Sequence, residues 1–129
     1  MTQTFNNSFI SRIHSIHKII SKHQVDAVLF SDMSNIRYLT GFTGSDGVLI
    51  VSIHDFRLLV DGRYTTQAAG EVDKIPIVQY EDKIYGIEQT VKELCFRRIG
   101  FEAEFMNVEM YNDLNRRLKK IELVPLSDE

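Results

Sequence analysis

The stretch NIRYLTGFTGSDGVLIVS, residues 35–52, decides how this chain is interpreted. Residues 35–47 form an aromatic and basic loop interrupted by three glycines, and Val48–Ser52 is an apolar run typical of a buried strand. A second apolar run, Phe56–Asp61, comes so soon afterwards that the two runs are predicted to pair as an antiparallel hairpin. The motif DGRYT, residues 61–65, comes next. Two loops rich in functional groups therefore flank one hairpin, which predicts the wall of a site.

The remaining sequence alternates between helical and strand patterns. Helices are expected from Asn7 or Ser8 over about four turns, as one turn at residues 36–39, and near residues 64–72, 87–94 and 107–118. Asn107 is the expected cap of the last of these helices. Further strands are expected at residues 25–31, 74–80, 98–102 and 121–126. One hairpin together with later strand–helix–strand crossovers predicts an α/β fold with a mixed β-sheet and flanking helices. Pro76 cannot donate to a strand ladder, so its strand is expected near an edge of the sheet.

Composition predicts one globular domain that spans residues 1–129. Hydrophobic residues make up 43% and charged residues 26%, as in ordinary globular proteins. The net charge is −3 and the basic residues are scattered, which argues against nucleic-acid binding. No apolar run approaches the roughly 18–20 residues that span a bilayer. Cys95 is the single cysteine, which rules out an internal disulfide and fits a reducing compartment; its place beside Leu94 predicts an inert buried thiol.

The two ends of the sequence carry expectations about location and boundaries. Residues 1–7 lack a basic start with an apolar stretch after it, so no signal peptide is expected and the predicted location is the cytoplasm. Residues 127–129 are polar and come directly after a predicted strand. A domain cut at its boundary and a native tail would both have this appearance.

Several kinds of catalytic or ligand site are disfavoured by the residue patterns. The glycine loop lacks both the G-x-G-x-x-G spacing and the terminal Gly-Lys-Ser/Thr of phosphate loops, and it leads into a strand. Ser45 lacks the G-x-S-x-G elbow of hydrolases. His14 and His17 have no third ligand for zinc, so they are expected to be solvated. The scattered aspartates have no spacing that forces a catalytic carboxylate pair.

Two features keep alternatives open. Asp61 and Arg63 are expected to make a local ion pair at a strand end, although Arg63 can also face a ligand. Tyr38 and Phe42 alternate with small and polar residues on one loop, and at least one of them is expected to anchor the loop in the core. An exposed aromatic residue would instead mark a substrate wall or a partner surface.

At these two loops the sequence resembles a known family. The segments NIRYLTGF, residues 35–42, and DGRY, residues 61–64, are similar to the N-terminal, creatinase-type domain of Xaa-Pro aminopeptidases and prolidases. The order of elements supports the resemblance over essentially the whole chain. It implies a ribonuclease-H-like α/β architecture that precedes a separate "pita-bread" catalytic domain. In the family, that second domain holds two divalent metal ions, such as manganese, which activate a bridging water.

The resemblance also implies a role for the loops. None of the family's metal-ligand segments occurs in this sequence, so no catalytic residue, metal ligand or cofactor is expected here. By position, Asn35, Tyr38 and Phe42, followed by Arg37 and Arg63, are the expected pocket-lining residues. Such a wall restricts substrate length and helps to dry a site. The expected partners are the catalytic domain, a second subunit in a homodimer, and an X-Pro peptide, with no nucleic acid and no membrane.

The sequence therefore predicts the non-catalytic N-terminal domain of a metal-dependent Xaa-Pro peptidase that shapes substrate access and dimer contacts. Whether the chain has enzymatic activity of its own stays open, with inactivity expected for the isolated domain. The alternative is a free-standing, non-enzymatic binding or interaction module with the same fold. A reading frame that continues beyond Glu129 into a segment rich in Asp, His and Glu would favour the enzyme. A third alternative is a small-molecule binding domain that uses the glycine loop. Thermal shift against nucleotides would check it, and no stabilisation is expected.

Overall fold

The computed structural model describes residues 7–127, with side chains from residue 10 onward. Its helices are α1 (Asn7–His23), α2 (Met33–Thr40), η1 (Gly62–Tyr64, a short 3₁₀ turn), α3 (Thr65–Glu71), α4 (Lys83–Glu93) and α5 (Val108–Arg117). Its strands are β1 (Ala27–Phe30), β2 (Val48–Ser52), β3 (Phe56–Asp61), β4 (Ile77–Tyr80), β5 (Arg98–Glu102) and β6 (Glu122–Leu126). Residues 1–6 and 128–129, on which the expectations about a leader and a tail rest, lie outside this description.

The strands form one mixed sheet in the order β4-β3-β2-β1-β5-β6. β2 runs antiparallel to both of its neighbours, whereas the β3–β4, β1–β5 and β5–β6 pairs are parallel. The predicted hairpin is present, with Val48 opposite Leu59 and Val51 opposite Phe56. The predicted α/β fold with a mixed sheet is confirmed. Pro76 directly precedes β4, which is an edge strand of the sheet, as predicted.

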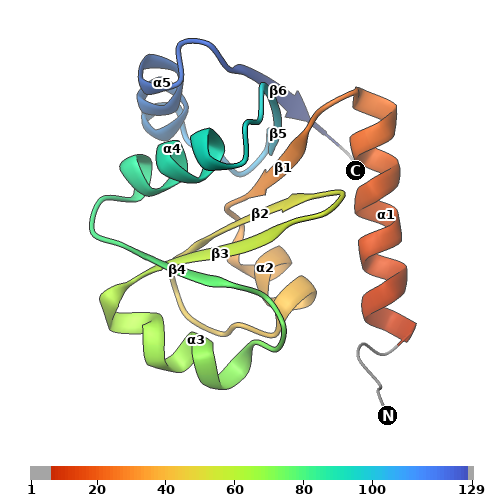
Figure 1. Ribbon diagram of the computed structural model, residues 1–129, viewed down its shortest axis with the longest axis vertical. Coiled ribbons are helices and arrows are strands. Elements are labelled where there is room, and N and C mark those ends of the chain that lie inside the picture. The colour runs from red at the N-terminus through yellow and green to blue at the C-terminus, as the bar shows by residue number, and fades with distance from the viewer. Residues whose placement is uncertain (1–6, 128–129) are drawn as a thin grey trace.

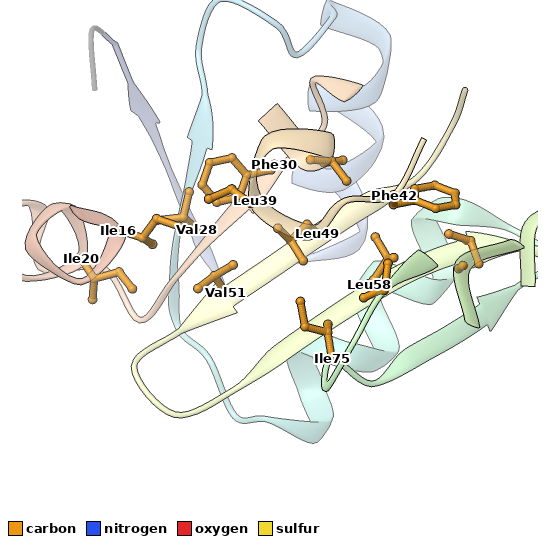
Figure 2. Close-up of a cluster of buried hydrophobic side chains, with 14 of the residues drawn as sticks. Ile16, Ile20, Val28, Phe30, Leu39, Phe42, Leu49, Val51, Leu58 and Ile75 are labelled. Atoms are coloured by element: carbon orange, nitrogen blue, oxygen red, sulfur yellow. The ribbon is translucent and has the colours of Figure 1, made fainter. Parts of the chain in front are cut away.

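Helices cover both faces of the sheet, and each face has its own hydrophobic core (Figure 1). The first core lies under α1, α2 and α3 and is built from alternate strand residues such as Val28, Leu49 and Leu58 (Figure 2). The second core lies under α4 and α5, where Ile87 and Leu114 pack on the other side of the same strands. Because successive strand side chains point to opposite faces, strands buried on both sides read as continuous apolar runs.

Two local predictions need correction. The single helical turn expected at residues 36–39 is the eight-residue helix α2, which begins at Met33. The expectation of a buried, helical Cys95 is wrong, because α4 ends at Glu93 and Cys95 is exposed with a φ of 60°. The left-handed backbone at Cys95 turns the chain so that Phe96, 8% exposed, enters the core in its place.

The topology brings the glycine loop and the DGRYT motif to the same end of the sheet. The carboxyl ends of β1, β3, β4, β5 and β6 all lie at this end, because these strands are mutually parallel. The loop before β2 joins them, because β2 runs the other way. In open α/β sheets, ligands commonly bind outside the carboxyl ends of the strands. No helix within residues 7–127 has the length and apolar character required to cross a membrane.

Candidate functional site

The first half of the site is α2, which carries three of the five predicted pocket-lining residues. Its buried face consists of Ile36 and Leu39, which face the first core. The helix ends at Gly41, whose φ of 86° is a left-handed conformation that a residue with a side chain adopts only with strain. The opposite face leaves Arg37 and Tyr38 exposed, and 59% of the Tyr38 surface is accessible. Helical periodicity therefore places these two side chains on the surface.

Phe42 anchors the glycine loop in the core. Its side chain has no exposed surface and meets the Tyr64 ring edge-on, at 5.9 Å between ring centroids. Gly44 lies directly over this ring, and a Cβ at Gly44 would come within 2.3 Å of Phe42 Cζ. The glycine is thus required because the loop crosses the aromatic ring in contact with it. Phe42 is the expected core anchor, so it has no surface from which to line a pocket.

Three polar connections fasten the rest of the loop to later elements. The Glu71 carboxylate accepts hydrogen bonds from the Thr43 backbone N–H at 2.8 Å and from the Thr43 hydroxyl at 2.7 Å. The hydroxyls of Ser45 and Tyr64 share a hydrogen bond. Lys83 Nζ lies 2.6 Å from Asp46 Oδ1. The contact between Ser45 and Tyr64 joins the glycine loop to the DGRYT motif, and the other two join it to α3 and α4.

Hydrogen bonds and neighbouring charges shift the pKa values of several groups in and around these two loops. Hydrogen bonds from Thr43, chiefly from its backbone N–H, lower the pKa of Glu71 below its ordinary value. The side chain of Arg63 lowers the pKa of Asp61 in the same way, and the Asp61 carboxylate raises the pKa of Arg63. Burial raises the pKa of the Tyr80 hydroxyl, and the negative charge of Asp46 raises it further. Tyr80 therefore stays neutral at physiological pH.

The DGRY turn has the local ion pair that the sequence predicted. Asp61 accepts from the Arg63 backbone N–H at 2.8 Å and from Nε and Nη2 of the Arg63 side chain at 3.2 and 2.9 Å. The Arg63 side chain remains 73% exposed. Arg63 is thus held in a fixed position by its own turn while its surface is open to solvent.

Glu102, at the end of β5, connects α2 to the other half of the sheet. Its Oε1 accepts from the backbone N–H of Ser31 at 2.6 Å and of Asp32 at 2.9 Å, and its Oε2 accepts from Asn35 Nδ2. The carboxylate thus satisfies the backbone N–H groups of the two residues that directly precede α2. Asn35, predicted to line a pocket, is held by this contact at the margin of a groove.

This groove, about 420 Å³ in volume, lies between α1, α2 and the carboxyl ends of β5 and β6. Asn35 and Tyr38 line it, together with Arg12, Ile16, Ile19 and Phe105. The Arg12 guanidinium lies 3.9 Å from the centroid of the Tyr38 ring, and Arg12 Nη1 donates to the Tyr38 carbonyl oxygen. Arg37, Phe42 and Arg63 are not among the lining residues. The structure thus brings two of the five predicted residues to the groove.

Sequence reasoning missed Arg12 and Glu102. Arg12 is an isolated basic residue on a helix flank, and nothing in its local pattern indicates a partner twenty-six positions away. Glu102 did carry a signal, since it is a carboxylate at the carboxyl end of a predicted strand. Its role depends on β5 pairing with β1, which is a long-range event.

His14 and His17, both predicted to be solvated, differ in their exposure. His14 is exposed, as expected, but His17 is half-buried and its Nε2 atom has no hydrogen-bond partner within the described residues, so it is not solvated as predicted. Within residues 7–127, no group of three or more His, Cys, Asp or Glu side chains could hold a metal ion. The donor set present here therefore does not fit the two metal ions that the family resemblance implies.

Together, the mixed sheet and its two joined loops define an α/β domain of the kind found at the N-terminus of creatinase-type proteins. Residues 12–129 match the Creatinase/Prolidase N-terminal domain family, and the chain belongs to this family. It is 29% identical over 118 residues to the uncharacterized peptidase YqhT of Bacillus subtilis, covering 91% of this chain and 33% of that protein. The chain thus spans about a third of the length of this relative.

Solved structures of similar proteins have the same fold. The N-terminal domain of the cytoplasmic peptidase PepQ from Mycobacterium tuberculosis superimposes with a TM-score of 0.84 at 32% identity, covering 91% of this chain and 93% of that one. An Xaa-Pro dipeptidase from Bacillus anthracis gives a TM-score of 0.86 at 26% identity, covering 92% of this chain and 34% of that one. The first of these structures consists of the domain alone, and the second is a chain about three times as long.

Proposed function

We propose that this chain is the non-catalytic N-terminal domain of a metal-dependent Xaa-Pro peptidase. In this role the exposed face of α2 forms part of the wall around an active site that another domain supplies. The wall limits the length of the peptide that reaches the site and contributes contacts within a homodimer. The observation that carries the proposal is the Tyr38 ring, which is 59% exposed and yet held in place by Arg12.

A fixed aromatic surface at a rim suits steric selection. A Tyr ring offers a large contact area with few rotatable bonds, and the cation–π contact with Arg12 restricts it further. Arg37 on α2 and Arg63 in the DGRY turn are both exposed and can interact with a peptide carboxylate or with the second subunit. Phe42 supports this wall from within the core.

The metal chemistry of such an enzyme belongs to the other domain in this proposal. The two divalent ions, such as manganese, would activate water there, and the present chain would contribute exclusion and positioning. Family membership and the length of the relatives support this division, because the chain matches about a third of a longer peptidase. We also propose a cytoplasmic location, because the similar domain from Mycobacterium tuberculosis belongs to a cytoplasmic peptidase, PepQ.

The test compares substrates of different length in the full-length protein. In Tyr38→Ala, the ratio of kcat/KM for a longer X-Pro peptide to that for an X-Pro dipeptide should change about tenfold, which corresponds to about 1.4 kcal/mol of differential binding. Tyr85→Ala is the matched control, since Tyr85 is also a half-exposed tyrosine, 51% accessible, but lies on α4. An unchanged ratio in Tyr38→Ala would contradict the role of the wall.

The isolated 129-residue chain provides the second test. It should not hydrolyse an X-Pro dipeptide in the presence of manganese, and robust metal-dependent turnover would refute the proposal. The native reading frame decides between the proposal and its alternative. Continuation into a segment rich in Asp, His and Glu supports the peptidase domain. A natural stop after Glu129 would instead identify a free-standing binding module.

A further inference from the structure

The groove beside α1 exists because that face of the sheet is only partly covered. α1 packs chiefly over β1 and β2. On the less covered side, Gly100 of β5 lies between Val28 of β1 and Val124 of β6. A Cβ at Gly100 would come within 2.6 Å of Leu126 Cδ1, so Leu126 occupies the space above the glycine. Val28 and Leu126 are among the lining residues, so the groove has an apolar floor over these strands.

Large apolar side chains surround this floor and are left in contact with solvent. Phe105 is 53% exposed and lines the groove. Ile19, on α1, is only partly buried against the first core. An exposed apolar hollow with a polar rim is typical of a surface that is covered in the complete protein. Arg12 and Glu104 supply the polar rim.

The chain itself leaves the described structure at this groove. Ser127, the last described residue, is one of the lining residues, and it comes directly after Leu126, which is 7% exposed. Figure 1 shows β6, the last described strand, ending with its arrowhead directed toward α1. A segment that continues from Ser127 therefore begins inside the groove. Because it is covalently attached there, its effective concentration at the groove is high, on the order of millimolar.

We infer that this groove is the docking site of the segment that continues from Ser127 in the longer protein. The segment packs along the groove against Ile19 and Phe105, and so fixes the orientation of this domain relative to the next domain of the chain. The inference rests on the proposed function to the extent that both require a longer chain. The relatives supply the reason to expect one, because this chain covers 33% of the YqhT peptidase and 34% of the B. anthracis dipeptidase.

Thiol labelling in two chain lengths tests the inference. In a Cys95→Ser background, Ser15→Cys places a thiol in the groove, where Ser15 is an exposed lining residue of α1. Ser21→Cys is the matched control, because Ser21 is exposed on the same helix but does not line the groove. The rate of reaction with a bulky maleimide is measured in the 129-residue chain and in the protein extended by its native continuation.

The docked segment should slow the labelling of Ser15→Cys about tenfold or more in the longer protein, which corresponds to occupation for about nine-tenths of the time. Labelling of Ser21→Cys should be equal in the two chains. Adding Phe105→Ser to the longer protein should return the rate at position 15 toward that of the short chain. Together these results would establish an occupied groove that depends on the aromatic residue.

Three outcomes overturn the inference. Equal labelling of Ser15→Cys in both chain lengths would show that the groove stays open. Protection in the 129-residue chain that increases with its concentration would assign the groove to a second copy. A reading frame that ends at Glu129 would leave no segment to dock. Peptidase activity is measured separately, so that an inactive longer protein with a protected groove counts against the proposed function and leaves the docking site intact.

Discussion

Arg12 and Tyr38 join the first helix to the motif helix through two interactions at once. The Arg12 guanidinium lies 3.9 Å from the centroid of the Tyr38 ring, and its Nη1 atom donates to the backbone carbonyl oxygen of Tyr38. The carbonyl lies in the last turn of α2, where backbone oxygens lack partners within the helix. Arg12 therefore fixes both the end of α2 and the ring that α2 presents.

Removal of this arginine should loosen α2. Arg12→Ala loses a charged hydrogen bond and a cation–π contact, so we expect a decrease of about 2 kcal/mol in the free energy of unfolding in urea. Lys18→Ala, which removes an exposed cation on the same helix, should change it by less than about 0.5 kcal/mol. Equal effects of the two substitutions would show that the contact with Tyr38 contributes nothing.

The crossing of the glycine loop over Phe42 predicts opposite effects for two Gly→Ala substitutions. Gly44→Ala would place its Cβ 2.3 Å from Phe42 Cζ and should destabilise the fold by roughly 1–3 kcal/mol, as overpacking does. Gly70→Ala, on α3, meets nothing within 4 Å and should stabilise the protein by up to about 1 kcal/mol. Thermal unfolding of both variants measures this difference. A neutral Gly44→Ala variant would mean that the Phe42 ring can move aside.

The contact between Asn35 and Glu102 can be measured with a double-mutant cycle. Asn35→Ala and Glu102→Ala should each reduce stability, and Glu102→Ala should reduce it more because two backbone donors also lose their acceptor. Residues in direct contact usually couple by about 0.5–3 kcal/mol. A coupling free energy near zero in urea unfolding would contradict a direct interaction. In that case Asn35 would be available to a ligand, as its motif position predicts.

Glu71 should make the stability of the loop depend on pH. Hydrogen bonds from Thr43, chiefly from its backbone N–H, lower the folded-state pKa of Glu71 below the ordinary 4.5. The unfolded state therefore binds a proton more readily than the folded state does. The contribution of ionised Glu71 to the free energy of unfolding is present above about pH 5, and it is lost as the pH falls through the folded-state pKa. Glu71→Gln should therefore be less stable than the natural protein near neutral pH, with a gap that narrows toward about pH 3.

Urea unfolding at a series of pH values measures the difference in stability between Glu71→Gln and the natural protein. Glu81→Gln is the control, because it removes one negative charge from an exposed loop residue. A gap that stays constant or widens toward low pH would contradict the role of the Thr43 hydrogen bonds. The mobility of the loop offers a further readout, since amide exchange at Thr43 should become faster in Glu71→Gln.

The sequence determined most of the elements because their signals are local. Val48–Ser52 and Phe56–Asp61 read as apolar runs, and they form the predicted hairpin. Asn107 is the predicted cap of a helix, and its side chain accepts from the Met110 backbone N–H at 2.7 Å. Capping and periodicity depend on residues within about one turn of each other, so they can be recognised without knowledge of the fold.

Tertiary structure decided which motif residues reach the surface. Phe42 and Tyr38 have similar sequence surroundings, yet one has no exposed surface and the other is 59% exposed. The difference arises because Tyr64, twenty-two residues later, packs on Phe42, whereas Arg12, twenty-six residues earlier, holds Tyr38 outward. Such contacts depend on how distant segments meet across the sheet. The sequence alone specifies the strands and helices, and only their assembly specifies which side chains meet at the groove.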